Sequence, residues 1–509
     1  MGEKHICVVG AGLGGVSCAS ILAHRGFKVT IVEKDDRPGG RNVPVELGDY
    51  SFDLGPTFLM MKFILDNIFR ETGRRVEDYL DLVRLEPMYR LIFDEFSLEF
   101  SNDPEKTKAQ IASAFPGAED GFDRYMNEEE KVFQYLFPCL QKAYSSWTSL
   151  LTPVFLKALP HLKLTRTVME NVTDYFDDER LGVAFSFQSK YLGMSPWTCP
   201  AVFTMLSYIE HAYGIYHVQG GINRVPASLA QVAEEEGAEI LLNSPVSHVR
   251  TTNGAATGVE LEDGRTIEAD EVVLNADFGY AASELLPHQR LGRWRPDRLR
   301  DKPFSCSTFM MYLGLDREVD LPHHNIVFAE DYRSNLADIF ERKVIGDELS
   351  YYVRNATVTD PNLAPEGHSA IYVLVPVPNN KSTIDWDRRK APFRKRVLDR
   401  LEELEALKGL RENIQRERIV TPDDWENDYN VYLGATFNLA HTLSQMMYFR
   451  PKNRFEGLDN CYLVGGGTHP GSGIPTILES GRISANLICD KYGVDYAEPS
   501  SLQELVSSS

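Results

Sequence analysis

The 509-residue sequence is poor in cysteine and contains no long apolar run. Its seven cysteines include no CxxC pair and no metal-ligand spacing, and Cys7 and Cys18 fall in an expected buried strand and helix. Such thiols are typical of a reducing compartment, so we expect a cytoplasmic protein without disulfides or a metal site. No stretch reaches the roughly eighteen apolar residues that cross a bilayer. A strand expected to begin at His5 leaves no room for a signal peptide.

Basic side chains are also fewer than acidic ones. The chain has 53 lysines and arginines against 74 aspartates and glutamates, a formal net charge of −21. Nucleic acid needs a basic surface to neutralise its phosphates, so we expect no nucleic-acid partner. Anionic lipid likewise attracts basic surfaces, so we expect no attachment to such a membrane by charge alone. Any contact with a membrane would therefore have to be apolar.

The first residues carry the clearest motif. Residues 10–15 read Gly-Ala-Gly-Leu-Gly-Gly; they follow an expected strand at 5–9 and begin an apolar helix. A second strand at 28–32 then ends on an acid. This order opens a dinucleotide-binding βαβ unit, in which the helix N-terminus binds the pyrophosphate and the acid accepts a ribose hydroxyl. It predicts a site containing Gly10, Gly12, Gly14, Gly15 and Glu33, and it does not decide between NAD and FAD.

The residues after this acid favour FAD. A glycine turn at 39–40 precedes Arg41, whose forked guanidinium can reach a second phosphate, and Phe-Asp-Leu-Gly-Pro-Thr follows at 52–57. The arrangement resembles the amine-oxidase and carotenoid-desaturase branch of flavoproteins, where a Gly-Gly-Arg turn carries the FAD diphosphate. The alternative is a polar loop with a surface arginine. For an FAD site, the residues expected here are Lys34, Gly40, Arg41, Gly55, Pro56 and Thr57.

A second glycine-rich turn lies near the other end of the chain. A strand at 460–464 runs into Gly-Gly-Gly-Thr-His-Pro-Gly-Ser-Gly-Ile-Pro at 465–475, and a helix follows through Cys489. A helix that starts at such a turn would favour the anionic, reduced isoalloxazine ring. The alternative is a loop that closes a sheet. We expect the turn to hold the flavin, and Val246 to complete an FAD site that includes Gly466, Gly467, Thr468, Gly473, Ile474 and Pro475.

Three segments are predicted to form one FAD-binding domain, at 1–75, 219–284 and 445–493. Two insertions separate them: a helical one at 76–218 and a substrate domain at 285–444 that mixes strands with a charged helix. Residues 494–509 are expected to be a flexible tail. The predicted fold is α/β, with a Rossmann-like FAD-binding domain split in sequence, a mixed-sheet substrate domain and a helical membrane-facing insertion.

The stretch from Phe133 to Leu164 is the most apolar part of the first insertion. Leucines, phenylalanines and Trp147 alternate there with lysines, and Pro153 and Pro160 divide it into short helices. This pattern is typical of helices that lie in a membrane interface. An ordinary amphipathic core helix gives a similar pattern, and both interpretations stay open. The first predicts a protein peripherally associated with the membrane.

Later motifs resemble the bacterial-type phytoene desaturases, the FAD-dependent carotenoid desaturases. They are Gly-Thr-His-Pro-Gly with Gly-Ile-Pro at 467–475, Asp-Pro-Asn-Leu-Ala-Pro-Glu-Gly at 360–367 with the strand at 372–378, and Phe-Arg-Pro-Lys-Asn at 449–453. The resemblance spans about residues 4–490. The helix at 476–482 departs from the enterobacterial type, which leaves the substrate in doubt.

The resemblance implies FAD-dependent desaturation of a lipid-soluble polyene, with oxygen or a quinone as electron acceptor. The first expectation is C40 phytoene, giving ζ-carotene, neurosporene or lycopene. The alternatives are a C30 dehydrosqualene (diapophytoene) desaturase, a carotenoid end-group oxidase, an amine oxidase and a non-catalytic carotenoid-binding flavoprotein. His469 is the candidate for proton transfer, since imidazole titrates near neutrality; it could instead only order the glycine turn. The oligomeric state stays open.

Overall fold

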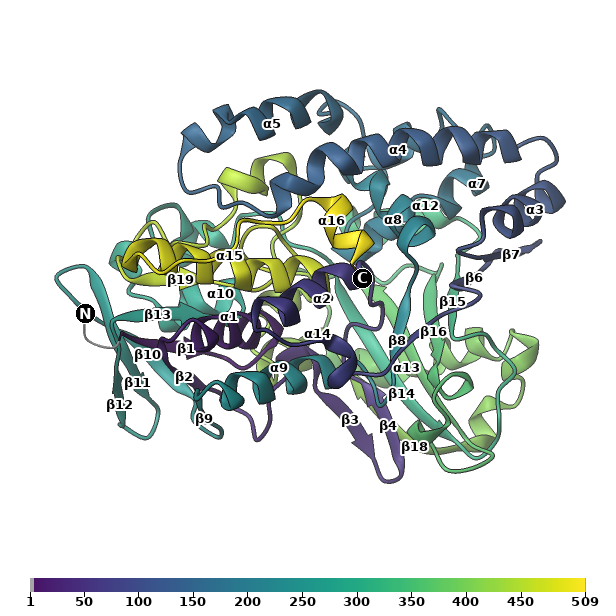
Figure 1. The fold of residues 1–509 in the computed structure, drawn as a ribbon. Coiled ribbons are helices and arrows are strands. Elements are labelled where there is room, and N and C mark those ends of the chain that lie inside the picture. The colour runs from purple at the N-terminus through teal and green to yellow at the C-terminus, as the bar shows by residue number, and fades with distance from the viewer. Residues whose placement is uncertain (1–3, 509) are drawn as a thin grey trace.

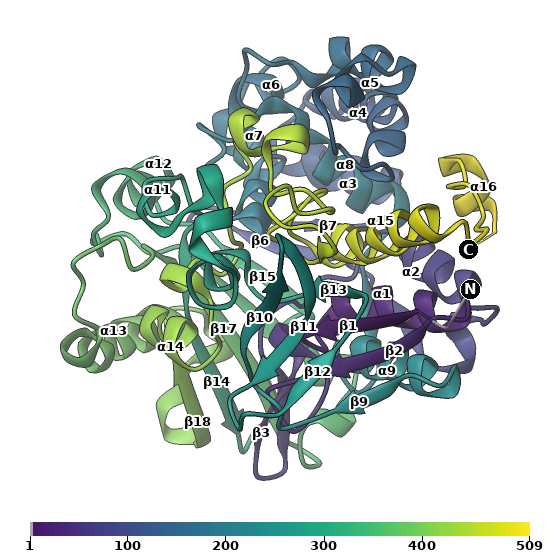
Figure 2. The ribbon, with the colours of Figure 1, turned by 90° about the vertical axis from the view of Figure 1, so that its left-hand side faces the viewer.

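The computed structural model describes residues 4–508. A parallel sheet and a mixed sheet lie side by side, and a layer of helices covers both (Figures 1 and 2). The parallel sheet draws its strands from all three segments that the sequence assigns to FAD binding, so the prediction of an FAD-binding-like sheet split in sequence is confirmed. Its strand order is β19 (Cys461–Leu463), β13 (Glu271–Leu274), β1 (His5–Val9), β2 (Lys28–Val32) and β9 (Glu239–Leu241).

Both faces of the parallel sheet are buried, as its apolar strands require. Ile6 and Val8 of β1 pack with the helices on one face, whereas Cys7 and Val9 pack with a small antiparallel sheet on the other. The helices are α1 (Leu13–His24), α2 (Lys62–Glu71), α9 (Arg224–Glu235) and α15 (Ile474–Tyr492). The antiparallel sheet comprises β10 (Val246–Thr252), β11 (Ala255–Leu261) and β12 (Thr266–Glu268).

The mixed sheet has seven strands, all antiparallel except for the β15–β6 pair. Residues alternate along β14, so that Phe309 and Met311 pack on helix α13 while Thr308 and Met310 face a cavity. The strands are β18 (Ile414–Val420), β14 (Ser307–Leu315), β17 (Ser369–Val377), β16 (Tyr351–Asn355), β15 (His324–Val327), β6 (Tyr89–Ile92) and β7 (Ser97–Phe100); the helices after β17 are α13 (Trp386–Leu401) and α14 (Pro422–Asn427).

The first insertion is only partly helical. Its strands β6 and β7 extend the mixed sheet of the second insertion. Tyr89 and Leu91, at alternate positions of β6, are buried, as expected for a strand with one face in the core. Two small ribbons pair β3 (Pro44–Leu47) with β4 (Tyr50–Asp53) and β5 (Leu82–Arg84) with β8 (Tyr216–Val218). The helices are α3 (Pro104–Ala114), α4 (Glu119–Leu140), α5 (Pro153–Ala158), α6 (Val168–Val172), α7 (Glu179–Ala184) and α8 (Met205–Tyr213), followed later by α10 (Phe278–Tyr280), α11 (Pro296–Leu299) and α12 (Tyr332–Ala337).

The C-terminal residues differ from the expected flexible tail. Helix α16 (Leu502–Ser507) packs against α2 and α4, and its Leu505 is fully buried. Ser501 and Glu504 form a capping box at its start, a short signal that the polar composition of the tail conceals. Within residues 4–508 all seven cysteines are free and buried, and no group of metal-ligating side chains forms. No helix in that range combines the length and apolar character that spanning a membrane requires.

Candidate active site

The first glycine turn exposes backbone donors at the start of α1. Gly10 adopts a φ of +95°, which lets its N–H donate to Val32 O at 2.7 Å. No side chain caps α1 at Gly12, so the first turn of the helix is left to bind an anion. A Cβ on Gly15 would lie 2.1 Å from Gly10 O, which shows how closely helix and strand approach.

Glu33 directly follows β2 beside this turn and is buried. One carboxylate oxygen accepts the Ala11 N–H at 2.7 Å and the other accepts the Asp35 N–H at 3.0 Å. Burial raises the pKa of Glu33, and the two backbone donors oppose that rise. Glu33 lines the cavity, and a carboxylate oxygen that accepts one hydrogen bond can accept another, so the side chain can accept a ribose hydroxyl.

Arg41 connects the first turn with two other segments of the chain. Its guanidinium donates to the Asp277 carboxylate and to Thr436 O, both at 2.7 Å. The second Asp277 oxygen accepts the Gly279 N–H, which fixes the carboxylate just after β13. Since a guanidinium has five N–H donors, Arg41 keeps donors for a phosphate while it holds the segments together.

The second glycine turn is shaped by a buried arginine. Arg450 is fully buried and donates to Gly466 O at 2.7 Å and to Thr468 O at 3.1 Å. Burial lowers its pKa to about 9. Asn453 donates to His469 O at 2.9 Å. The Phe-Arg-Pro-Lys-Asn motif at 449–453 thus orders the turn by binding its carbonyl groups.

These parts meet at one cavity of about 530 Å³. Gly15, Thr468 and His469 do not line it: Gly15 packs under the first turn, and the Thr468 hydroxyl donates to Pro451 O. The roles of the predicted residues in holding FAD remain predictions. Those that line the cavity are Gly10, Gly12, Gly14, Glu33, Lys34, Gly40, Arg41, Gly55, Pro56, Thr57, Val246, Gly466, Gly467, Gly473, Ile474 and Pro475.

His469 faces away from this cavity. Its ring packs edge-on against Tyr144 with centroids 4.9 Å apart and is buried. Burial, reinforced by the charge of Arg450, lowers the pKa of His469 to about 3, so the ring is neutral at ordinary pH. The structure thus places a neutral imidazole between the glycine turn and the helical layer, and its catalytic role remains a prediction.

The other end of the cavity is apolar and aromatic. Tyr352 lines it, and its hydroxyl lies 3.0 Å from Thr57 Oγ1 and 2.6 Å from His324 Nδ1. Most of this wall could not be expected from the sequence, because its residues come from separate strands, loops and a short helical segment that meet only in the folded protein. It includes Phe58, Met60, Phe187, Tyr191, Met310, Ile326, Tyr352, Tyr372, Leu374 and Pro376.

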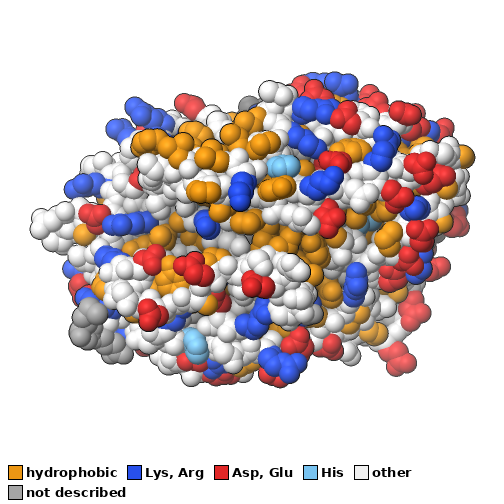
Figure 3. Space-filling view, turned by 45° about the horizontal axis from the view of Figure 1, so that its top comes forward, with side chains coloured by type: hydrophobic (Ala, Val, Ile, Leu, Met, Phe, Trp, Pro, Cys, Tyr) orange, Lys and Arg blue, Asp and Glu red, His pale blue; other side chains and the backbone are white. Residues whose placement is uncertain are grey.

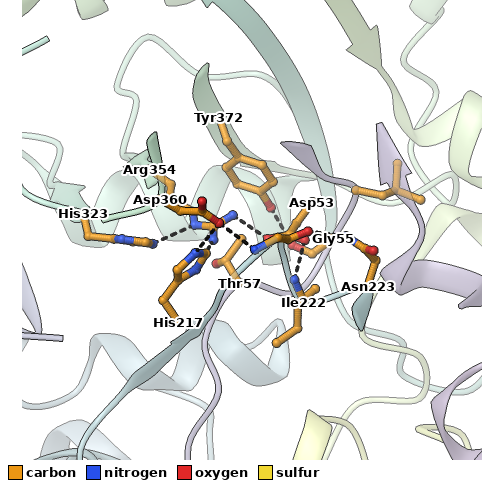
Figure 4. A network of polar contacts seen from close by, with 12 residues as sticks. Asp53, Gly55, Thr57, His217, Ile222, Asn223, His323, Arg354, Asp360 and Tyr372 are labelled. Atoms are coloured by element: carbon orange, nitrogen blue, oxygen red, sulfur yellow. Dashed lines mark hydrogen bonds and ion pairs between the residues drawn. The ribbon is translucent and has the colours of Figure 1, made fainter. Parts of the chain in front are cut away.

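A buried polar network fixes the strand that leads to this wall (Figure 4). Arg354 donates to Asp53 at 2.5 Å and is held by the imidazoles of His217 and His323. Tyr372 donates to Gly55 O at 2.8 Å. These contacts join β4 to β8 and to the mixed-sheet strands β16 and β17, and so hold the segment at 55–57, which follows β4.

The two ends fit FAD and an apolar substrate. The glycine cradle, the open start of α1 and Glu33 suit the ADP half, and the turn at 465–475 borders the same cavity. Comparison with known proteins agrees. The family described as flavin-containing amine oxidoreductase matches residues 13–489. A 4,4′-diapophytoene desaturase (4,4′-diapolycopene-forming) from Methylomonas sp. is 50% identical over 97% of this chain and 97% of its own length.

The chain belongs to the carotenoid desaturases of the flavin-containing amine oxidoreductase family. It is an FAD-dependent oxidoreductase, as the sequence predicts. An all-trans-ζ-carotene desaturase from Myxococcus xanthus is also 39% identical, over 96% of this chain and 94% of its own length. A triple mutant of putrescine oxidase shares the fold, with a TM-score of 0.62 at 14% identity over 97% of this chain and 99% of the other.

Proposed function

We propose that this desaturase acts on a C30 polyene, 4,4′-diapophytoene (dehydrosqualene), and adds conjugated double bonds to it. The observation that carries the proposal is the 50% identity, over nearly the full length of both chains, to a desaturase of that substrate. The C40 phytoene expected first is supported less well, since the C40 enzyme from Myxococcus xanthus is 39% identical. The alternative C30 substrate therefore becomes the main proposal.

The apolar end of the cavity supports a hydrocarbon substrate. A polyene offers no polar handle, so its binding rests on buried apolar area at about 25 cal/mol per Å². Met310 and Leu374 of the mixed sheet and Phe187 of the first insertion supply such area next to the glycine turn. FAD, when bound, would accept the electrons removed from the substrate, and we propose oxygen or a quinone as its reoxidant.

Glu33, Arg41 and the turn at 465–475 would hold this cofactor. Glu33 would accept a ribose hydroxyl, and Arg41 would donate to the diphosphate from the position that Asp277 fixes. The N-terminus of α15, preceded by Gly473 at a φ of +117°, would stabilise negative charge on the reduced ring.

We further propose that the helical layer rests on a membrane and receives the substrate there. Apolar side chains stand out on this face among lysines, and Trp147 is 62% exposed (Figure 3). Tyr144 contacts Phe155 of α5 and also His469, so these helices lie directly over the second glycine turn. The exposed apolar residues here are Tyr135, Trp147, Leu151, Leu156, Leu159 and Leu164, which we call the apolar face.

Anaerobic mixing of the purified holoenzyme with each substrate in liposomes tests the proposal. With 4,4′-diapophytoene we expect the flavin absorbance to bleach and a conjugated product to form, faster than with phytoene. Faster reduction of the flavin by phytoene would instead show that the enzyme is a C40 desaturase. If only an already desaturated carotenoid bleaches the flavin, the protein is an end-group oxidase. Release of peroxide on addition of an amine would indicate an amine oxidase. Pigment binding without bleaching would indicate a non-catalytic flavoprotein.

A further inference from the structure

Lys190 is a basic side chain at the apolar end of the cavity. It belongs to the short helical segment Phe187–Leu192, whose Phe187 and Tyr191 form part of the aromatic wall, and Lys190 lines the cavity with them. Its Nζ donates to Ser350 Oγ at 2.8 Å and lies 4.5 Å from the centroid of the Tyr332 ring. The amine is thus held at a fixed place beside the substrate space.

No carboxylate among residues 4–508 forms an ion pair with Lys190. Other buried cations differ: Arg354 pairs with Asp53 and Arg482 with Glu479. An ammonium group without a counter-ion is costly in an apolar site, so its proton is easily lost.

The groups that face Lys190 are neutral. The Cys306 thiol and the Tyr332 phenol are the titratable neighbours, and burial raises the pKa of Cys306 to about 12 and that of Tyr332 well above its usual value. Burial lowers the pKa of Lys190 to about 7. The amine is therefore available in its neutral form near pH 7 and above.

Other protic groups at this end of the cavity are poor proton acceptors. Burial raises the pKa values of Tyr191, Tyr352 and Tyr372, so these phenols keep their protons. His324 reaches the cavity through Tyr352, and burial lowers its pKa well below the usual value, so an imidazolium there is disfavoured. The carboxylates that line the cavity, Glu33, Asp35, Glu262 and Asp277, belong to the first and middle segments of the nucleotide-binding half.

We propose that the Lys190 amine is the proton acceptor in desaturation. The inference rests on the proposed function. At two adjacent saturated carbons, one C–H bond would break as its hydrogen leaves with the bonding electron pair, and oxidised FAD, when bound, would be the acceptor of this hydride and so of two electrons. The neighbouring carbon loses a proton to the Lys190 nitrogen, and the electron pair of that second C–H bond becomes the new C=C bond. The ammonium later returns its proton to solvent.

Stopped-flow reduction of the flavin by substrate, without oxygen, tests this role. Lys190→Met preserves the length and apolar character of the side chain, and we expect it to slow flavin reduction by about 100-fold or more while FAD stays bound. Lys190→Arg should be equally slow, because guanidinium does not release its proton. Lys395→Met, on the exposed face of α13, is the matched control and should reduce at the wild-type rate.

The pH profile gives a second measurement. In the wild type, the rate of flavin reduction should rise as pH increases through about 7, since only the neutral amine accepts a proton. Lys190→Met should lack this rise. A wild-type rate in Lys190→Met, or an unchanged rise with pH, would overturn the proposal.

A polyene aldehyde such as retinal provides a test that does not depend on turnover. A neutral amine facing the cavity should form an imine with it, and cyanoborohydride should fix the adduct on the peptide that contains Lys190. Competition by the hydrocarbon substrate and loss of the adduct in Lys190→Met are expected; labelling elsewhere would contradict the placement. If no polyene reduces the wild-type flavin, the proposed function fails, whereas the labelling result still decides whether Lys190 presents a neutral amine to a polyene.

Discussion

Arg41 and Asp277 form an ion pair of 2.7 Å that joins the first glycine turn to the end of β13. The Asp277 side chain is only 4% exposed, whereas that of Arg41 is 31% exposed and lines the cavity. We propose that the same guanidinium serves both folding and cofactor binding.

Arg41→Lys should weaken FAD binding more than it weakens the fold. An ammonium can keep the ion pair with Asp277 but has no forked face for the diphosphate, so we expect the Kd for FAD to rise about tenfold, or ~1.4 kcal/mol. Fluorescence titration of the apoprotein measures it. Arg37→Lys, on the exposed loop beside Asp36, is the control, and equal Kd values for the two variants would disprove the phosphate role.

The apolar face should bind neutral membranes. Replacing Trp147, Leu151 and Leu156 together by serine removes three side chains that are each at least half exposed. We expect the wild type to float with phosphatidylcholine liposomes and to be released by detergent but not by salt, because the contact is apolar. The triple variant should stay in the soluble fraction with its melting temperature little changed.

Two apolar residues elsewhere on the surface supply the control for that experiment. Val344 and Val358 are 45% and 58% exposed and lie in the mixed-sheet domain. Their serine variants should float as the wild type does. If the triple variant floats as well, the apolar face does not bind the membrane.

His469→Gln should leave flavin reduction by substrate largely intact. The imidazole is neutral, packs on Tyr144 and does not line the cavity, so its loss should lower thermal stability by about 1–3 kcal/mol rather than the reaction rate. Calorimetry and anaerobic stopped flow separate the two effects. A variant that retains FAD but fails to reduce it would assign proton transfer to His469 and remove the need for Lys190.

Glu210→Gln should make the protein more stable at high pH. Glu210 is buried, accepts hydrogen bonds from Tyr89 and Gln188, and burial raises its pKa from 4.5 to about 7. The folded state therefore holds a proton that the unfolded state has released, so this group costs stability as pH rises from about 4.5, and the full cost is reached above about 7.

The amide of the glutamine variant imitates the protonated acid, so the melting temperatures of the two proteins should coincide below about pH 4.5, separate as the pH rises, and differ by a constant amount above about pH 7. Thermal unfolding followed by circular dichroism across this range measures the difference. A constant offset between the two curves would show that Glu210 stays ionised in the folded protein.

Local sequence order predicted the parallel sheet well. A strand, a glycine turn, a helix and an acid follow one another within residues 5–33, so their contacts are short-range and readable. The turn at 465–475 is readable for the same reason. The ion pair of Arg41 with Asp277 could not be foreseen, because the two residues are 236 positions apart and meet only when β13 pairs with β1.

The apolar end of the site was harder to predict. Aromatic residues such as Phe187 look alike in a core and in a substrate cavity. Along β14 and β17, only the register of the strands decides which side chains face inward. Lys190 gave no local signal at all, since a single lysine between apolar residues is usually at the surface. Its burial follows from the packing of Ser350 and Tyr332 around it.

The position of β19 at the edge of the parallel sheet, next to β13, has a consequence for biosynthesis. Arg450, β19 and the turn at 465–475 leave the ribosome long after the first glycine turn, so in that interval the nascent chain lacks one of the two turns that we propose to hold FAD. We expect FAD capture to wait until these segments have emerged, and the supply of FAD at that moment to govern how much of the newly made chain escapes proteolysis.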